Sequence, residues 1–388
     1  MAERIKVGLI YSYQEQWIAG AYYIENLVHA LNALPDALKP SIVLLCSNNK
    51  DFERINRATN YPYINWHSLN VKYNIIERVI NKVCRTITKR NFIEKLPTNK
   101  NIDVLFPSMD FIPLPVERKI YWIPDFQEDY LPHFFSEEEV KYRKSLQKRL
   151  SELETNIVFS SQDALNDFER LYPKHVCKTY VLRFAVTHPS GYKSLDIQNI
   201  RQKYNIPKDY FFVPNQFWVH KNHILVLKAL QVLKSKGEDY CVAFSGKQED
   251  YRSPNHFEKL KDYVQKHQLE ENVRFLGFID RAEQLALMKH AKAVIQPSLF
   301  EGWSTVVEDV KAMNQMVILS DLKVHREQTE NYNNKHFFNP HDEHDLATKI
   351  QKVYHEYDGS NNFSYNYQND IERFGKRFVE ILRDVIGN

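Results

Sequence analysis

The chain has 388 residues, which suits two domains of roughly 150–200 residues each better than one core. Hydrophobic residues make up 43% and charged residues 26%, so the protein is globular and not disordered. Its four cysteines lack metal-ligand spacing, which excludes a zinc ribbon and a disulfide scaffold. No apolar run approaches the roughly 20 residues of a membrane span. We expect no signal peptide, and a cytoplasmic protein.

The net charge of +3 is too weak to predict nucleic-acid binding, but the surplus is local. Residues 51–100 carry ten Lys and Arg against four Asp and Glu. Within residues 79–95, apolar side chains alternate with basic ones. This pattern fits a peripheral contact with the inner face of an anionic membrane. It equally fits a solvated helix whose apolar side faces the core, and both interpretations stay open.

Strand and helix patterns alternate along the first half of the chain. Short apolar runs predict buried strands, and apolar residues at helical spacing predict a helix over residues 22–34. Ser161, with Asp163 in the first turn, predicts the start of another helix. The strands are expected at residues 5–11, 41–46, 104–107, 119–124, 156–159 and 180–184. This alternation predicts a parallel sheet with helical crossovers.

The same pattern restarts after a polar, proline-containing stretch that begins near residue 186. Strands are expected at 210–213, 240–244, 273–276, 293–296 and 316–319, with helices between them, and the period of the tail predicts a helix over 366–386. We therefore predict two doubly wound α/β domains facing across a cleft, 1–187 and 188–365. Residues 366–388 are expected to form a C-terminal helix. Ligands of such sheets bind outside the carboxyl ends of the strands.

Glycine is scarce, with only ten in the chain. Gly20, Gly246, Gly277 and Gly302 fall near predicted strand ends, where a ligand would approach the backbone. Each also fits an ordinary turn with positive φ. The sequence contains neither a Walker motif nor G-x-G-x-x-G, which argues against a P-loop kinase or a dehydrogenase.

The stretch 296–313 carries the strongest chemical signal. A strand ends, Pro297 and Ser298 turn the chain, and Glu301 and Gly302 precede a helix. Amides at that helix N-terminus predict an anion site with a carboxylate beside it. A phosphate on the amides and a sugar hydroxyl on Glu301 is one interpretation. The other is that Glu301 is a first-turn acid interacting with the helix dipole.

This stretch resembles the P-S-x-x-E-G-[FW]-[GS] signature of family-4 glycosyltransferases, which have the GT-B fold. The matching residues are Pro297, Ser298, Glu301, Gly302, Trp303 and Ser304. The resemblance extends over nearly the whole chain. Residues 214–223 are similar to the family's diphosphate loop, 275–279 to its base-binding turn, 122–132 and 160–163 to its acceptor domain, and 339–347 to a late segment of its nucleotide domain.

The resemblance implies retaining, metal-independent transfer from a nucleotide-diphosphate sugar to a saccharide or lipid-linked saccharide, in surface polysaccharide or glycoconjugate synthesis. It implies no resident cofactor. Lys221 would contact the diphosphate and Glu301 the sugar hydroxyls, and Asp125 and Glu128 would lie at the catalytic centre. Further donor contacts are implied for Gly20, Asn215, Gln216, Gly246, Gly277, Ile279, Gly302, Trp303, Ser304, Thr305 and Asp309.

Three positions depart from the family pattern. Asp309 stands where the ribose-binding acid is usually Glu, with Glu308 beside it. Gln216 replaces an Arg of the diphosphate site, and Glu128 replaces a His. These departures leave two alternatives open, a catalytically weak partner subunit of the same fold and a nucleotide-sugar epimerase-like enzyme.

Overall fold

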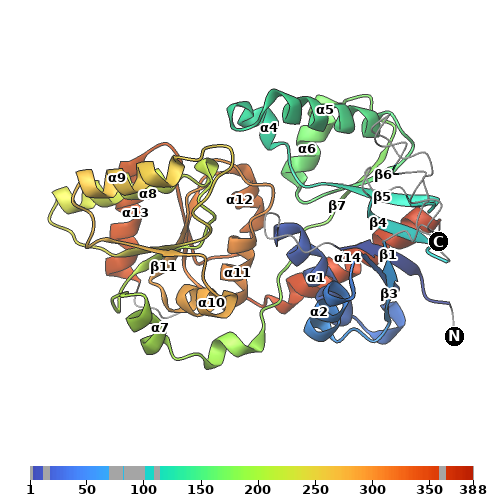
Figure 1. The fold of residues 1–388 in the computed structure, drawn as a ribbon, viewed down its shortest axis with the longest axis horizontal. Coiled ribbons are helices and arrows are strands. Elements are labelled where there is room, and N and C mark those ends of the chain that lie inside the picture. The colour runs from blue at the N-terminus through green and yellow to red at the C-terminus, as the bar shows by residue number, and fades with distance from the viewer. Residues whose placement is uncertain are drawn as a thin grey trace.

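The protein consists of two α/β domains that lie side by side, each built around a parallel β-sheet (Figure 1). The computed structural model describes residues 3–11, 18–69, 82, 101–108, 114–357 and 364–387. The basic stretch 79–95 therefore lies outside the described residues except for Lys82. Within the described parts, no helix has the length and apolarity needed to cross a membrane.

The first sheet has the order β3-β2-β1-β4-β5-β6-β7, and every described pair is parallel. Its strands are β1 (Lys6–Ile10), β2 (Ser41–Cys46), β3 (Ile64–Ser68), β4 (Val104–Ser108), β5 (Arg118–Ile123), β6 (Asn156–Phe159) and β7 (Lys178–Val181). The helices of this half are α1 (Ile18–Asn32), α2 (Asn49–Thr59), α4 (Gln127–Tyr130), α5 (Glu137–Ser151) and α6 (Gln162–Leu171). Ser161 caps α6, as its sequence predicts, by accepting a hydrogen bond from the Ala164 amide.

The second sheet has the order β10-β9-β8-β11-β12-β13 and is also parallel in every described pair. Its strands are β8 (Phe211–Val213), β9 (Val242–Ser245), β10 (Val273–Gly277), β11 (Ala293–Gln296), β12 (Val317–Ser320) and β13 (Lys335–Phe338). Its helices are α7 (Ile197–Lys203), α8 (His223–Ser235), α9 (His256–Lys266), α10 (Arg281–His290), α11 (Thr305–Met313), α12 (Lys323–Gln328) and α13 (Glu343–Glu356). Separate apolar clusters fill the two faces of this sheet.

The last helix, α14 (Gln368–Ile386), leaves the second domain and packs on the first (Figure 1). Its Phe374 and Phe378 belong to the core of the first sheet. A Cβ added at Gly375 would lie 2.5 Å from the Ala30 carbonyl oxygen of α1. The absence of a side chain at Gly375 therefore sets how closely α14 approaches α1.

Two edge strands, β3 and β13, are missing from the sequence prediction. The residues of β3 are half-buried or exposed, and three of the four residues of β13 are half-buried. An edge strand with one solvated side lacks the continuous apolar run that predicts a buried parallel strand.

Candidate active site

A cavity of about 650 Å³ lies between the two domains and is lined by residues of both. The first domain contributes residues that follow β5, and the second contributes the loops after β8, β9 and β11. The carboxyl ends of the two sheets therefore face one shared space, where ligands of such sheets bind. Ten of the predicted site residues line it: Asp125, Asn215, Gln216, Lys221, Glu301, Gly302, Trp303, Ser304, Thr305 and Asp309.

Lys221 and Glu301 both line this cavity and form an ion pair. The Lys221 ammonium lies 2.5 Å from Glu301 Oε1, which also accepts a hydrogen bond from Gln296 at 2.8 Å. Burial by itself would raise the pKa of Glu301, but the Lys221 ammonium, and after it His325, outweigh burial and lower the pKa. Glu301 is therefore a carboxylate at neutral pH, able to accept hydrogen bonds from hydroxyl groups.

The turn before α11 is held by protein on several sides. A Cβ at Gly302 would lie 2.7 Å from the Pro124 carbonyl oxygen, so the first domain closes directly on this glycine. The Trp303 indole donates to the Phe184 carbonyl at 3.0 Å. The Ser304 amide donates to Gln328 Oε1 at 3.1 Å, so this amide is engaged within the protein. Among the described residues, the backbone amides of Gly302, Trp303 and Thr305 donate no hydrogen bond. These three amides are therefore the donors that remain for the predicted anion site.

Asp309 is tied to two basic residues that the sequence analysis did not single out. Its Oδ1 accepts from His188 Nε2 at 2.9 Å and from Arg281 at 2.5 Å. Burial would raise the pKa of Asp309, but Arg281 and His188 prevail and lower it. Asp309 Oδ2 is buried without a hydrogen-bond partner in the described structure. His188 comes from the interdomain linker, residues 182–189 after β7, and Arg281 comes from the start of α10. No local motif marks either position.

Asp125 lines the cavity from the first domain and is half-buried. Burial raises the pKa of its carboxyl to about 6, although the Gln127 amide donates to it at 3.1 Å. A carboxyl with a pKa near 6 can hold or release a proton close to neutral pH.

Glu128 lies elsewhere. Its carboxylate is fully buried in the first domain, does not line the cavity, and accepts hydrogen bonds from Gln147 and Arg143 of α5. It directly follows Asp125, Phe126 and Gln127 in sequence, but α4 begins there and turns Glu128 toward α5. Its position corrects the expectation of a catalytic carboxylate and indicates a structural one.

The remaining predicted donor contacts also fall outside the cavity lining. Gly20 is in the first turn of α1, and Ile279 is packed in the core of the second domain. Gly246 abuts the Asn215 backbone, and its amide donates to the Gly277 carbonyl. Gly277 has a φ of 71°, which favours glycine. Packing and turn geometry account for both of these glycines.

Several cavity residues escaped the sequence analysis. Lys247 follows Gly246, and its amide donates to the side chain of Gln216. Tyr251 is 72% exposed and lies at the cavity with Trp218 and Phe300.

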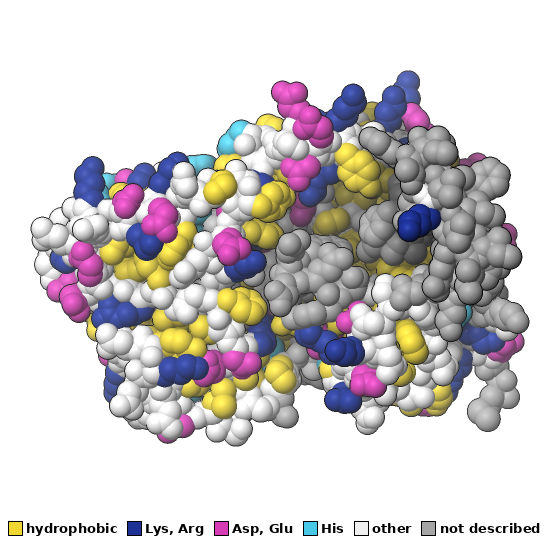
Figure 2. Space-filling model, viewed as in Figure 1, with side chains coloured by type: hydrophobic (Ala, Val, Ile, Leu, Met, Phe, Trp, Pro, Cys, Tyr) yellow, Lys and Arg dark blue, Asp and Glu magenta, His cyan; other side chains and the backbone are white. Residues whose placement is uncertain are grey.

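On the face shown in Figure 2, charges of both signs are interspersed over the described residues without a large patch of one sign.

The second domain is similar to a known protein family. Residues 196–370 match the model of the family described as glycosyl transferases group 1. This part of the chain is similar to that family and makes up most of the second domain. It contains Lys221, the turn before α11 and Asp309. No curated protein matches the chain.

Solved structures match both domains together. A glycosyltransferase from Rickettsia africae ESF-5 is 14% identical with a TM-score of 0.64, and each chain is covered completely. Anabaena Alr3699/HepE in complex with UDP and glucose is 15% identical with a TM-score of 0.65, covering 98% of this chain and 100% of that one. WaaG, a glycosyltransferase involved in lipopolysaccharide biosynthesis, is 12% identical with a TM-score of 0.59, covering 99% and 100%. The fold is GT-B.

Proposed function

We propose that the protein is a retaining glycosyltransferase that moves a sugar from a nucleoside-diphosphate donor to a hydroxyl group of an acceptor. One observation carries the proposal. Lys221, Glu301 and the amide-bearing turn before α11 line one cavity, although eighty residues of sequence separate the lysine from the glutamate. The HepE structures in complex with UDP, and with UDP-glucose, support a uridine diphosphate donor as the first candidate.

In the proposed reaction, a bond forms between the acceptor oxygen and the anomeric carbon of the sugar. The bond from that carbon to the diphosphate breaks, and the acceptor proton passes to the leaving phosphate. Negative charge grows on the diphosphate as it leaves. The Lys221 ammonium and the amides of Gly302, Trp303 and Thr305 would stabilise that charge, and Glu301 would orient the sugar through its hydroxyls.

The donor is a co-substrate in this proposal, and no resident cofactor takes part. A saccharide or lipid-linked saccharide is the proposed acceptor, in the synthesis of a surface polysaccharide or glycoconjugate. The similarity to WaaG, a glycosyltransferase involved in lipopolysaccharide biosynthesis, supports this direction.

The decisive experiment measures donor binding and consumption by the full chain. A panel of UDP-, GDP- and ADP-sugars is screened by thermal shift, and release of the nucleoside diphosphate is followed with and without oligosaccharide acceptors. We expect Lys221→Ala and Glu301→Ala to lower transfer by about 10²-fold because each removes one contact to charge or sugar in the transition state. Lys203→Ala is the matched control, since Lys203 pairs with Glu283 away from the cavity.

Each alternative gives a different result. Wild-type turnover in purified Lys221→Ala or Glu301→Ala would contradict the site assignment. Absence of nucleotide binding at millimolar concentration would favour the partner-subunit alternative. Donor conversion without an acceptor, and without release of nucleoside diphosphate, would favour the epimerase-like one. The anomeric configuration of the product, read by NMR, tests retention.

A further inference from the structure

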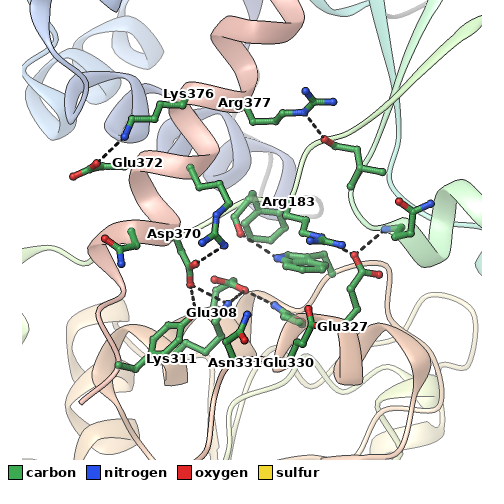
Figure 3. A pocket seen from close by; sticks show the side chains of 18 of the residues that line it. Arg183, Glu308, Lys311, Glu327, Glu330, Asn331, Asp370, Glu372, Lys376 and Arg377 are labelled. Atoms are coloured by element: carbon green, nitrogen blue, oxygen red, sulfur yellow. Dashed lines mark hydrogen bonds and ion pairs between the residues drawn. The ribbon is translucent and has the colours of Figure 1, made fainter. Parts of the chain in front are cut away.

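A second hollow, of about 620 Å³, lies on the domain boundary (Figure 3). It shares Phe184 and Trp303 with the first cavity. The linker after β7, helices α11 and α12, and helix α14 surround it. Each lysine and arginine of its lining pairs with a carboxylate that also lines it. The pairs are Arg183–Glu327, Lys311–Glu308, Arg373–Asp370, Lys376–Glu372 and Arg377–Glu380. Arg183–Glu327 joins the segment after β7 to α12, whereas the other four pairs lie within α11 or within α14.

Glu308 is the most deeply buried carboxylate of this hollow, with 1% of its surface exposed. Its Oε1 accepts from Lys311 at 3.0 Å and from Gln328 at 2.8 Å. Its Oε2 accepts from the Tyr367 hydroxyl at 2.6 Å. Lys311 in turn lies 3.2 Å from Asp370 of α14 (Figure 3). Three donors on one buried carboxylate make a satisfied network of high cost to disrupt.

Gln328 carries this network into the turn before α11. Its Nε2 donates to both Glu308 and the Ser304 carbonyl, each at 2.8 Å. Its Oε1 accepts from the Ser304 amide at 3.1 Å. As a carboxylate, Glu308 accepts hydrogen bonds and donates none. The Nε2 end of the Gln328 amide must therefore face it. Glu308 thereby holds Ser304 through both of its peptide groups.

Tyr367 carries the network in the other direction, to the segment that joins the domains. Its hydroxyl accepts from the Val186 amide at 2.7 Å while it donates to Glu308. Two residues earlier, the Phe184 carbonyl accepts from the Trp303 indole. The linker is thus tied to the turn twice, directly through Trp303 and indirectly through Tyr367, Glu308 and Gln328.

We propose that Glu308 is a positioning residue that couples the turn before α11 to the interdomain linker and to α14 through Tyr367. The turn then takes its ligand-binding geometry when the linker and α14 are docked. Glu308 stands beside Asp309 in sequence. It acts on the site through the turn and does not contact a ligand. The inference rests on the proposed function only in naming a nucleoside diphosphate as the ligand of the turn.

Tyr367→Phe tests the coupling, because it removes one hydroxyl and leaves Val186 and Glu308 each short of a partner. Tyr332→Phe is the matched control. The hydroxyl of Tyr332 is also buried and donates to the Val310 and Gln315 carbonyls near the other end of α11. Glu308→Gln is the second variant and keeps the shape of the side chain. Calorimetric titration with UDP, GDP and ADP measures affinity, and hydrogen exchange of the segment 300–307 is measured in the protein alone.

We expect Tyr367→Phe and Glu308→Gln to weaken nucleoside-diphosphate binding by about 3- to 30-fold and to speed exchange in 300–307. Tyr332→Phe should lower the melting temperature about as much as the two network variants do. It should change neither the nucleotide affinity nor the exchange in 300–307. Unchanged affinity and exchange in both network variants, or equal effects in Tyr332→Phe, would overturn the proposal. If the wild type binds none of the three nucleotides, the proposed function fails. Hydrogen exchange then decides the coupling alone: faster exchange supports it and unchanged exchange refutes it.

Discussion

Gly302→Ala gives the sharpest test of how the two domains meet. The added Cβ would lie 2.7 Å from both the Pro124 carbonyl oxygen and Asp125 Cβ, and 2.9 Å from Asp125 Oδ2. Ordinary contact begins at 3.4 Å, so the first domain and the turn must separate by about 0.7 Å. The nearest oxygen is backbone and directly follows β5, so it cannot rotate away as a flexible side chain would. The clash can therefore be relieved only if the two domains move apart.

The expected cost follows from that separation. Overpacking of this kind costs about 1–3 kcal/mol. A displacement of about 1 Å between reacting groups lowers the rate by about 10²-fold. We therefore expect kcat/KM to fall by about 10- to 10²-fold. The melting temperature should fall by about 2–12 °C, since each kcal/mol shifts it by about 2–4 °C in domains of this size.

Gly191→Ala is the control for this substitution, because a Cβ there meets nothing within 4 Å. The assay is steady-state release of nucleoside diphosphate with acceptor present, beside a thermal melt of both variants. If Gly302→Ala turns over like the wild type, the domains do not need this approach during transfer. A loss of activity matched by Gly191→Ala would likewise refute the reasoning.

Three further predictions concern stability. The pKa of Asp125 is about 6 in the folded chain against an ordinary 3.8, so between these values the folded state holds a proton that the unfolded state has released. The free energy of unfolding therefore falls as pH rises from about 4 to 6. Urea unfolding of Asp125→Asn should show a flatter pH dependence of this free energy in that range. Glu327 accepts from the first two amides of α6, at 2.8 and 3.1 Å, and pairs with Arg183, so Glu327→Ala should lower the free energy of unfolding by about 1–2 kcal/mol in the same assay. Gly375→Ala should lower the melting temperature despite the better helix propensity of alanine, because its Cβ would meet the Ala30 carbonyl; a rise would contradict the packing of α14 on α1.

The sequence predicts what is encoded locally. Buried strands such as β2 and β11 are unbroken apolar runs, and the turn before α11 carries its own motif. The contacts between residues far apart in sequence leave no such trace. His188, Arg281 and Gln328 reach the site from three separate elements, and each is ordinary in its own segment. Glu128 shows the opposite failure, since adjacency to a motif in sequence does not determine which side of a helix faces the cavity.

The turn before α11 shows why these long-range contacts matter for catalysis. Three consecutive residues are each held by a different part of the chain: Gly302 by the end of β5, Trp303 by the Phe184 carbonyl, and Ser304 by Gln328. Electrostatic stabilisation of a leaving group is effective when the donors are oriented before charge develops, since no energy is then spent on turning them. A turn held only by its own helix would fray at the N-terminus. Because the turn before α11 is fixed from the other domain, the linker and α12, the orientation of its amides depends on how the two domains meet.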